Sequence, residues 1–236
     1  MKYAEVKEQF TALQAYVEGQ NYAGWDPYDG LNSKLFQATP LRHSRLARLA
    51  WIQLFKRNPI NLRVITGVPK GHNPKGLALF LSAYVHQQRR SPDAKRQIKI
   101  NALVKHILEI QTPGYSGACW GYNFDWQAKA FFQPRRTPTV VATSYVANAL
   151  LDTFELTGNP ELLRIARSSC DFVLKDLNRT SDAHGDFCFS YSPLDQTQIY
   201  NASLLGSRLL LRLFTHTHEE HLKTTALQSV RYCCRA

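Results

Sequence analysis

The sequence predicts an all-α protein, an incomplete (α/α) toroid of about four helical hairpins with short β-like hairpin loops on one face. Three observations lead to this prediction. Apolar residues recur at three-to-four spacing through most of the chain, which is typical of helices that bury one face. A pattern of two helices recurs about every 60 residues. Short turns join the two helices of a pair, whereas long aromatic loops join one pair to the next.

The predicted helices carry recognisable signals at their ends. In the segment 160–177, Leu, Ile, Phe and Val form a stripe on one side. Asn159 is suited to cap the first turn of this helix, and Gly158 to end the helix before it. Pro92 and Asp93 open another helix in the same way. In chain order we expect helices at residues 3–18, 41–57, 75–89, 94–110, 140–157, 160–177, 201–215 and 219–235.

The internal repeat predicts how these helices are arranged. Residues 143–174 contain a helix, a short turn and a second helix, and residues 201–234 repeat that order. An earlier copy includes residues 83–102. A single hairpin cannot bury its apolar stripe alone, so successive hairpins are expected to stack. We therefore predict one toroid domain over residues 1–236.

The C-terminal end of the sequence falls within a helical pattern, at residues 231–236. Four hairpins are also fewer than a closed ring needs. Two expectations follow. Either the toroid is truncated at its C-terminal end, or an open array pairs with a second copy to form a homo-oligomer.

Two long loops are predicted to carry the function. Residues 111–139 and 178–198 separate successive hairpins, and each contains a short alternating stretch that predicts a strand pair at one rim. Long loops gathered on one face of a repeat array usually hold the functional residues. The candidate site should therefore lie on the face where these loops meet.

The composition narrows the class of partner and the location. The chain has 29 Lys and Arg against 18 Asp and Glu, a net charge of +11, which favours an anionic partner. No block of five like charges and no nucleic-acid motif occurs, so we predict no nucleic acid. The longest apolar run, residues 76–85, predicts no membrane insertion. Residues 1–20 lack a signal-peptide core, so we expect a cytoplasmic protein with five reduced Cys.

The densest motif is the segment 24–33, which combines two carboxylates, two aromatic rings, Gly and Pro. Asp26 and Asp29 are the predicted catalytic groups, as general acid or base. The alternative is a structural turn in which both Asp residues only shape the loop. The residues predicted to bind substrate here are Trp25, Tyr28 and Asn32.

A second cluster lies in the first long loop, at residues 119–126. Asp125 supplies another predicted catalytic carboxylate, and the aromatic and amide groups around it suit a carbohydrate. Arg135 could hold the acid group of a sugar, or be a solvated charge. The alternative for the cluster is a hairpin packed at the rim. Its predicted substrate-binding residues are Trp120, Tyr122, Asn123 and Trp126.

A third group of polar residues precedes apolar helices. Tyr191 precedes the helix predicted at 201–215 and Asn201 stands at its start, and both are predicted to bind substrate. Thr139 and Asn73 hold the matching places in earlier repeats, where helix capping is the expected role. If the helices that follow these residues form the inner layer of the toroid, their N-termini lie together at one opening of the ring. Helix N-termini favour anions, so this opening would favour an anionic ligand.

Neither a metal nor a cofactor is predicted. The three His residues near position 218 resemble a metal cluster, but they fall in a short turn and lack an accompanying carboxylate motif. They are His216, His218 and His221.

Several of these motifs together resemble a bacterial family of six-hairpin-glycosidase-like (α/α) toroids associated with polysaccharides. Some members carry the label aminolevulinate dehydratase, which this sequence does not support, since it lacks the strand–helix alternation of a β/α barrel. The resemblance implies a ring of helical hairpins with a cleft at the long-loop face, and a role in polysaccharide synthesis or processing. The segments that carry it are 24–33, 119–126, 137–143, 187–191 and 200–203.

Three functions stay open from the sequence. The first is an enzyme acting on an anionic poly- or oligosaccharide, as a glycoside hydrolase, polysaccharide lyase or uronyl epimerase. The second is a non-catalytic saccharide-binding or scaffold protein. The third is a toroid of the prenyltransferase or terpene-cyclase kind, which would need an aspartate-rich Mg²⁺ site or zinc ligands. Fold alone does not choose among them.

Overall fold

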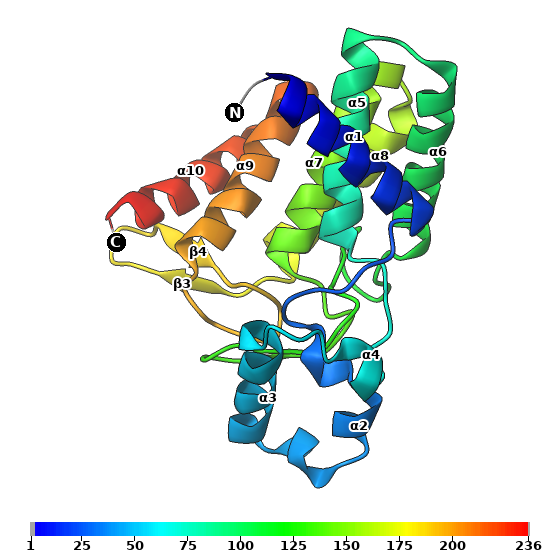
Figure 1. Ribbon diagram of the computed structural model, residues 1–236. Helices are drawn as coiled ribbons and strands as arrows, with labels where there is room; N and C mark the ends of the chain where they lie inside the picture. Colours follow the sequence, from blue (N-terminus) through cyan, green and yellow to red (C-terminus); the bar gives the residue numbers. More distant parts are fainter. Residues whose placement is uncertain (1–2, 236) are drawn as a thin grey trace. The chain divides into compact units, whose positions relative to one another are not determined.

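The computed structural model describes residues 3–235, and almost all of its regular structure is helical (Figure 1). This confirms the predicted all-α class. The elements are α1 (Tyr3–Gly19), η1 (Asp29–Asn32), α2 (Lys34–Gln37), η2 (Pro40–His43), α3 (Arg45–Arg57), α4 (Arg63–Thr66), α5 (Pro74–Arg90), α6 (Ala94–Glu109), β1 (Trp126–Gln127), β2 (Phe132–Gln133), α7 (Val140–Thr157), α8 (Pro160–Lys175), β3 (Arg179–Ser181), β4 (Phe187–Phe189), α9 (Tyr200–Thr217) and α10 (Glu220–Arg235).

Each of the eight predicted helices matches a helix of the structure, with small differences at the ends. The caps explain the agreement. The side chains of Asn159 and Asp93 accept backbone N–H groups at the start of α8 and α6, and Gly158 ends α7 in a left-handed conformation. The helix predicted at 41–57 is divided into η2 and α3, because Ser44 caps α3 at its own N-terminus.

The chain divides into two compact units. Unit 1 comprises the described residues up to Asn73 together with Asn123–Gln127, and unit 2 comprises Pro74–Tyr122 and the described residues from Ala128 onward. Compact units of this kind can be parts of one domain. The single domain expected over residues 1–236 therefore stays a prediction.

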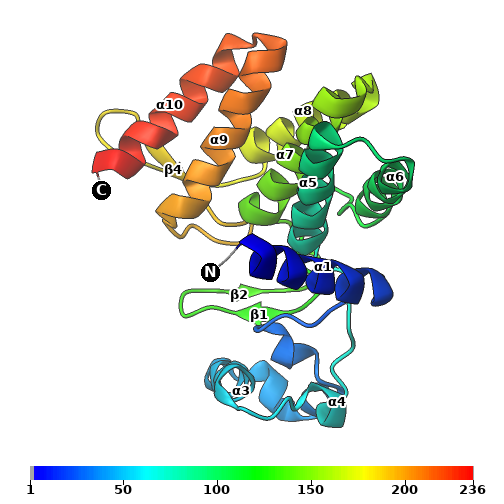
Figure 2. The ribbon, with the colours of Figure 1, turned by 45° about the horizontal axis from the view of Figure 1, so that its top comes forward.

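Unit 2 is a stack of three helical hairpins, α5/α6, α7/α8 and α9/α10 (Figure 2). Helix α7 lies between α5 and α9, so these three form one layer, and α6, α8 and α10 pack on their outer sides. Most residues of helix α7 are buried, including the small polar residues Thr143, Ser144 and Thr153, because it lies between two other helices. The expectation that successive hairpins stack is confirmed for these three hairpins.

The helices expected to make a fourth hairpin are not paired with each other in that way. Helix α3 packs chiefly on η1, η2 and β1, all within unit 1. The residues between α1 and α3 form three short helical elements of their own, η1, α2 and η2. Three hairpins are stacked in the described part of unit 2, and α1 and α3 belong to unit 1.

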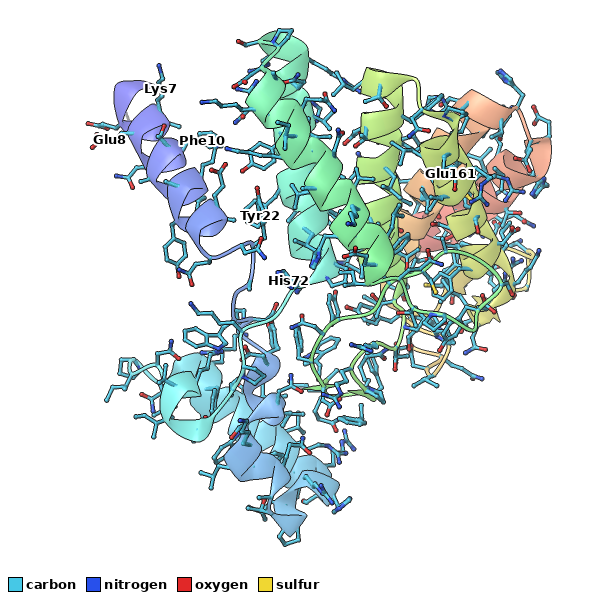
Figure 3. The ribbon with its side chains drawn as sticks, turned by 90° about the vertical axis from the view of Figure 1, so that its right-hand side faces the viewer. Lys7, Glu8, Phe10, Tyr22, His72 and Glu161 are labelled. Carbon is cyan, nitrogen blue, oxygen red and sulfur yellow. The ribbon has the colours of Figure 1, made fainter. Side chains whose placement is uncertain are left out.

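Unit 1 is held together by an aromatic cluster and a backbone bridge. Trp51 of α3 stacks on Phe36 at 5.1 Å between ring centroids and donates its indole N–H to the carbonyl oxygen of Gly30. Gly24 and Gly71 exchange two backbone hydrogen bonds, which join the start of the loop 24–33 to the chain just before α5. Figure 3 marks Tyr22 and His72, which lie next to this bridge in sequence.

The second long loop contains a strand pair, as predicted. Strands β3 and β4 are antiparallel, with Thr180 opposite Cys188. Strand β4 packs on α10, and ion pairs reinforce this contact. The carboxylate of Asp186, just before β4, pairs with Arg231 and Arg235 of α10 at 2.8 Å and 2.5 Å.

The Asp186 ion pairs predict a pH-dependent stability. Hydrogen bonds from Arg231 and then Arg235 lower the pKa of Asp186 below its usual 3.8. The stabilisation is therefore present above the unfolded pKa and is lost as the pH falls through the folded pKa. We expect the melting temperature of Asp186→Asn to lie below that of the wild type at pH 7. This gap should shrink below about pH 4. A gap that is constant from pH 7 to pH 3 would contradict the prediction.

The rim of unit 2 is formed where loop backbone meets the N-terminus of α7. Thr139 caps this helix, as expected, and Val140 donates its N–H to the carbonyl oxygen of Tyr191. Gly121 lies so close to the chain beyond it that a Cβ there would approach the carbonyl oxygen of Thr137 to 2.2 Å. Only glycine permits this close approach. Among residues 3–235, no helix is long and apolar enough to cross a membrane.

Candidate functional site

The loop 24–33 of unit 1 is fixed by its own carboxylates. Asp29 is buried, with 3% of its surface exposed. One of its oxygens accepts the backbone N–H of Asp26 at 2.9 Å, and the other pairs with the Arg63 guanidinium at 2.8 Å. Arg63 also donates to the carbonyl oxygen of Asp26. Asp29 and Arg63 therefore hold the loop in shape.

The electrostatic environment of Asp29 combines opposing effects. Burial raises the pKa of its carboxyl group, and the N–H of Asp26 and the charge of Arg63 oppose this rise. A raised pKa suits a general acid, but both oxygens of Asp29 already accept hydrogen bonds from the protein. Its geometry favours the structural alternative for Asp29.

Asp26 lies nearer the surface of unit 1. It is half-buried, and its two oxygens accept the backbone N–H of Tyr28 at 3.0 Å and the side-chain amide of Asn73 at 3.2 Å. Asn73 directly precedes α5, whose capping residue it was expected to be, and its side-chain amide donates to Asp26. Asp26 is thus the more accessible of the two carboxylates in this loop.

The segment 123–127 lies against this loop within unit 1. The backbone N–H of Asp125 donates to the Asn32 side-chain oxygen at 3.3 Å. The ring of Trp126 meets that of Tyr28 edge-on, with centroids 5.9 Å apart. We call Asp26, Tyr28, Asn32, Asp125 and Trp126 the loop cluster. All five are half-buried, so the cluster lies at the surface of unit 1.

Basic side chains border the loop cluster. The Lys56 ammonium donates to the Tyr28 hydroxyl at 3.0 Å and lies 4.9 Å from the centre of its ring. Nearby in the loop, Trp25 donates its indole N–H to the carbonyl oxygen of Val68, and Lys70 lies over its ring. Asn123 packs against Gly71. The loop cluster therefore combines carboxylates, an amide and aromatic rings, and the Lys56 cation lies beside it.

Trp120 does not occupy a position that a sugar could reach. It is fully buried in unit 2, where its indole N–H donates to the carbonyl oxygen of Ile107 at 2.8 Å. Its backbone N–H donates to the hydroxyl of Thr143. The prediction of Trp120 as a stacking surface is therefore corrected to a core role, because both ring faces contact protein.

The other predicted residues of unit 2 lie around its rim. The hydroxyls of Tyr122 and Tyr191 are 3.0 Å apart, and the ring of Phe131 packs on Tyr191. Tyr191 is 7% exposed, so its role includes packing as well as hydrogen bonding. Arg135 and Asn201 are exposed. Of these residues, the structure brings Tyr122 and Tyr191 into contact.

Arg63 and Lys56 are site residues that the sequence did not reveal. Their contacts join Arg63 to Asp29 and Lys56 to Tyr28, across 34 and 28 residues of sequence. Neither lies in a motif, and many other basic residues surround them in the sequence. No local signal distinguishes them. The described part of the chain holds no group of three or more His, Cys, Asp or Glu side chains arranged to bind a metal.

Among known proteins, matches to this chain were found only in the comparison with solved structures. No protein-family model matches the chain, and no curated protein sequence matches it. A crystal structure of D-mannose isomerase matches with a TM-score of 0.49 and 16% identity, covering 85% of this chain and 55% of that chain. An inactive variant of an α-1,6-mannanase from Salegentibacter sp. HEL1_6, in complex with α-1,6-mannotetrose, matches with a TM-score of 0.48 and 12% identity. It covers 80% of this chain and 55% of that chain.

A second variant of the same mannanase, in complex with α-1,6-mannotriose, matches with a TM-score of 0.46 and 13% identity. It also covers 80% of this chain and 55% of the other. The chain thus spans little more than half the length of the solved structures it matches. At these identities the likeness concerns the fold alone.

Proposed function

We propose that this protein is a carbohydrate-active protein whose loop cluster binds an anionic poly- or oligosaccharide. One observation carries the proposal. Two segments about 90 residues apart meet in unit 1 through the Asn32–Asp125 hydrogen bond and the Tyr28–Trp126 contact. Their meeting gathers carboxylates, an amide and aromatic rings at one surface. The mannose-acting neighbours lie below a TM-score of 0.5, and the proposal rests on the cluster instead.

Each group in the cluster has a role in this proposal. The apolar faces of Trp126 and Tyr28 would pack on a sugar ring, and Asn32 would hydrogen-bond its hydroxyls. The charge of Lys56 would attract a uronate or sulfate group. Asp125 would act as acid or base together with Asp26, in a hydrolase, lyase or epimerase reaction.

Binding tests the saccharide part of the proposal. On an array of uronate-containing and neutral mannose-containing oligosaccharides, we expect binding to the uronates. Trp126→Ala should weaken this binding roughly tenfold, a loss of about 1.4 kcal/mol. Tyr232→Ala, a half-buried aromatic of α10, is the matched control and should bind as the wild type does. Equal binding by both variants would contradict the proposed site.

Turnover separates an enzyme from a binding protein. If Asp125 is catalytic, Asp125→Asn should bind the same oligosaccharide but turn it over at least roughly a hundredfold more slowly. Asp171→Asn, on α8, is the control carboxylate. Binding without turnover in the wild type would favour the non-catalytic alternative.

A further inference from the structure

The positive charge of the protein is concentrated in one segment. Between Gly30 and Pro92 the sequence has eleven Lys and Arg residues and no Asp or Glu. The rest of the chain therefore has 29 − 11 = 18 basic residues against 18 acidic ones, and is neutral. Eight of the eleven basic residues precede Pro74 and so belong to unit 1. Basic residues occur along the whole chain, whereas acidic residues are missing between Gly30 and Pro92. The net positive charge of the chain therefore lies in that segment.

The same segment exposes large apolar side chains. Leu46 is 77% exposed, Ile60 64%, Val64 70% and Ile65 78%. These four are among only seven large apolar residues of the described chain that are more than 60% exposed. Single exposed apolar residues are common, but these four lie within 20 residues of sequence, and exposed apolar side chains that gather at one surface are typical of binding sites. We call residues 42–65 the basic–apolar segment.

Helix α3 shows how the two properties are combined. Ile52 and Phe55 are buried on one side of the helix. Leu46, Leu54 and Arg57 fall on the opposite side at 100° per residue, and all three are exposed. A helix that buries one apolar side normally presents polar residues on the other. The outer side of α3 instead presents Leu side chains next to a cation.

From this combination we propose that the basic–apolar segment docks on the surface of an anionic lipid bilayer, without spanning it. Phosphate headgroups would neutralise the exposed basic side chains, Arg42, Arg45 and Arg57 among them. Leu46, Ile60, Val64 and Ile65 would enter the boundary between headgroups and acyl chains. Docking of this kind needs no membrane-spanning helix. The inference does not rest on the proposed saccharide-binding role, although Lys56 lies in both surfaces.

Other occupants fit the surface less well. A nucleic acid or a soluble polyanion would use the charges but would leave the exposed Leu, Ile and Val side chains in water. A second copy of this chain, paired through the same surface, would bring two sets of positive charges together without acidic partners. An anionic bilayer satisfies both the charges and the apolar groups.

Vesicle co-sedimentation of the full chain tests the proposal. We expect binding to vesicles of phosphatidylcholine mixed with phosphatidylglycerol, and little binding to phosphatidylcholine alone. Arg57→Glu should weaken binding roughly tenfold, and Ile65→Ser roughly fivefold. The matched controls are Lys95→Glu and Ile98→Ser in α6, both exposed, and these should bind as the wild type does.

The competing occupants give different results. Binding to anionic vesicles that Arg57→Glu weakens but Ile65→Ser leaves unchanged would indicate a site for polyanions in general and overturn the proposal. A dimer in solution that Ile65→Ser dissociates, without vesicle binding by the wild type, would overturn it in favour of a second copy. Loss of vesicle binding in the α6 controls would also overturn it. Oligosaccharide binding should be unchanged in every variant.

Discussion

Replacing Trp120 with alanine is expected to destabilise unit 2 by about 3–5 kcal/mol, the usual cost of removing a large buried ring. The side chain is fully buried, and its indole N–H satisfies the carbonyl oxygen of Ile107 near the end of α6. The substitution therefore leaves a cavity and an unpaired acceptor. Because the chain has two compact units, amide hydrogen exchange along α6 and α7 is the suitable measurement.

Two comparisons sharpen this prediction. Trp120→Phe keeps most of the ring volume but removes the N–H donor, so it should cost clearly less than Trp120→Ala. Trp126→Ala affects a half-buried residue of unit 1 and should leave exchange along α7 unchanged. Loss of saccharide binding by Trp120→Ala, with wild-type exchange rates, would instead support the stacking role first predicted for Trp120.

Replacing Arg63 with methionine is expected to destabilise unit 1 by about 3–5 kcal/mol at neutral pH. The substitution leaves the buried carboxylate of Asp29 without its cation, which costs far more than the loss of an exposed pair. The carbonyl oxygen of Asp26 loses a donor as well. Hydrogen exchange in α3 and η1 should report the effect, because α3 packs on η1.

The pH dependence of Arg63→Met has a definite sign. Burial already raises the pKa of Asp29 above its usual 3.8, and loss of Arg63 removes an influence that lowers it. A group with a raised pKa stabilises the fold below its unfolded pKa, and this stabilisation is lost as the pH rises through the folded pKa. Destabilisation of unit 1 should therefore be smallest below about pH 4 and largest at neutral pH.

A double variant separates the charge from the packing. Asp29→Asn combined with Arg63→Met removes both charges and should be less destabilised at pH 7 than Arg63→Met alone. If the single and double variants are equally destabilised at every pH, the ion pair is not the cause. In that case the packing of the Arg63 side chain over Phe55 would be the better explanation.

The helices of unit 2 were predictable because their determinants are local. The stripe of apolar residues, the Asn159 cap and the Gly158 terminus all act within one or two turns of the chain. The strand pair β3–β4 also connects neighbouring residues. The arrangement of unit 1 was not predictable in this way. The sequence predicted no helix between residues 18 and 41, where the structure has η1, α2 and the start of η2.

Two Trp residues show how far the candidate site could be predicted from the sequence. Trp120 and Trp126 belong to the same motif and were predicted to share one function. One is completely buried in unit 2 and the other is half-buried beside Tyr28 in unit 1. Both are Trp residues in the same aromatic-rich motif, so the local sequence does not distinguish them. The burial of each ring depends on which distant segment packs on it, and this cannot be predicted from the local sequence.

The sequence by itself determined the all-α class, the helix boundaries and the candidate motifs, because hydrophobic periodicity and capping are local properties. Tertiary structure decided which carboxylate is buried against Arg63, which Trp belongs to the core, and which two segments meet at the loop cluster. It also decided that Leu46, Ile60, Val64 and Ile65 of the basic–apolar segment are exposed. These outcomes depend on contacts between residues far apart in sequence, where burial and charge pairing are set by the fold as a whole.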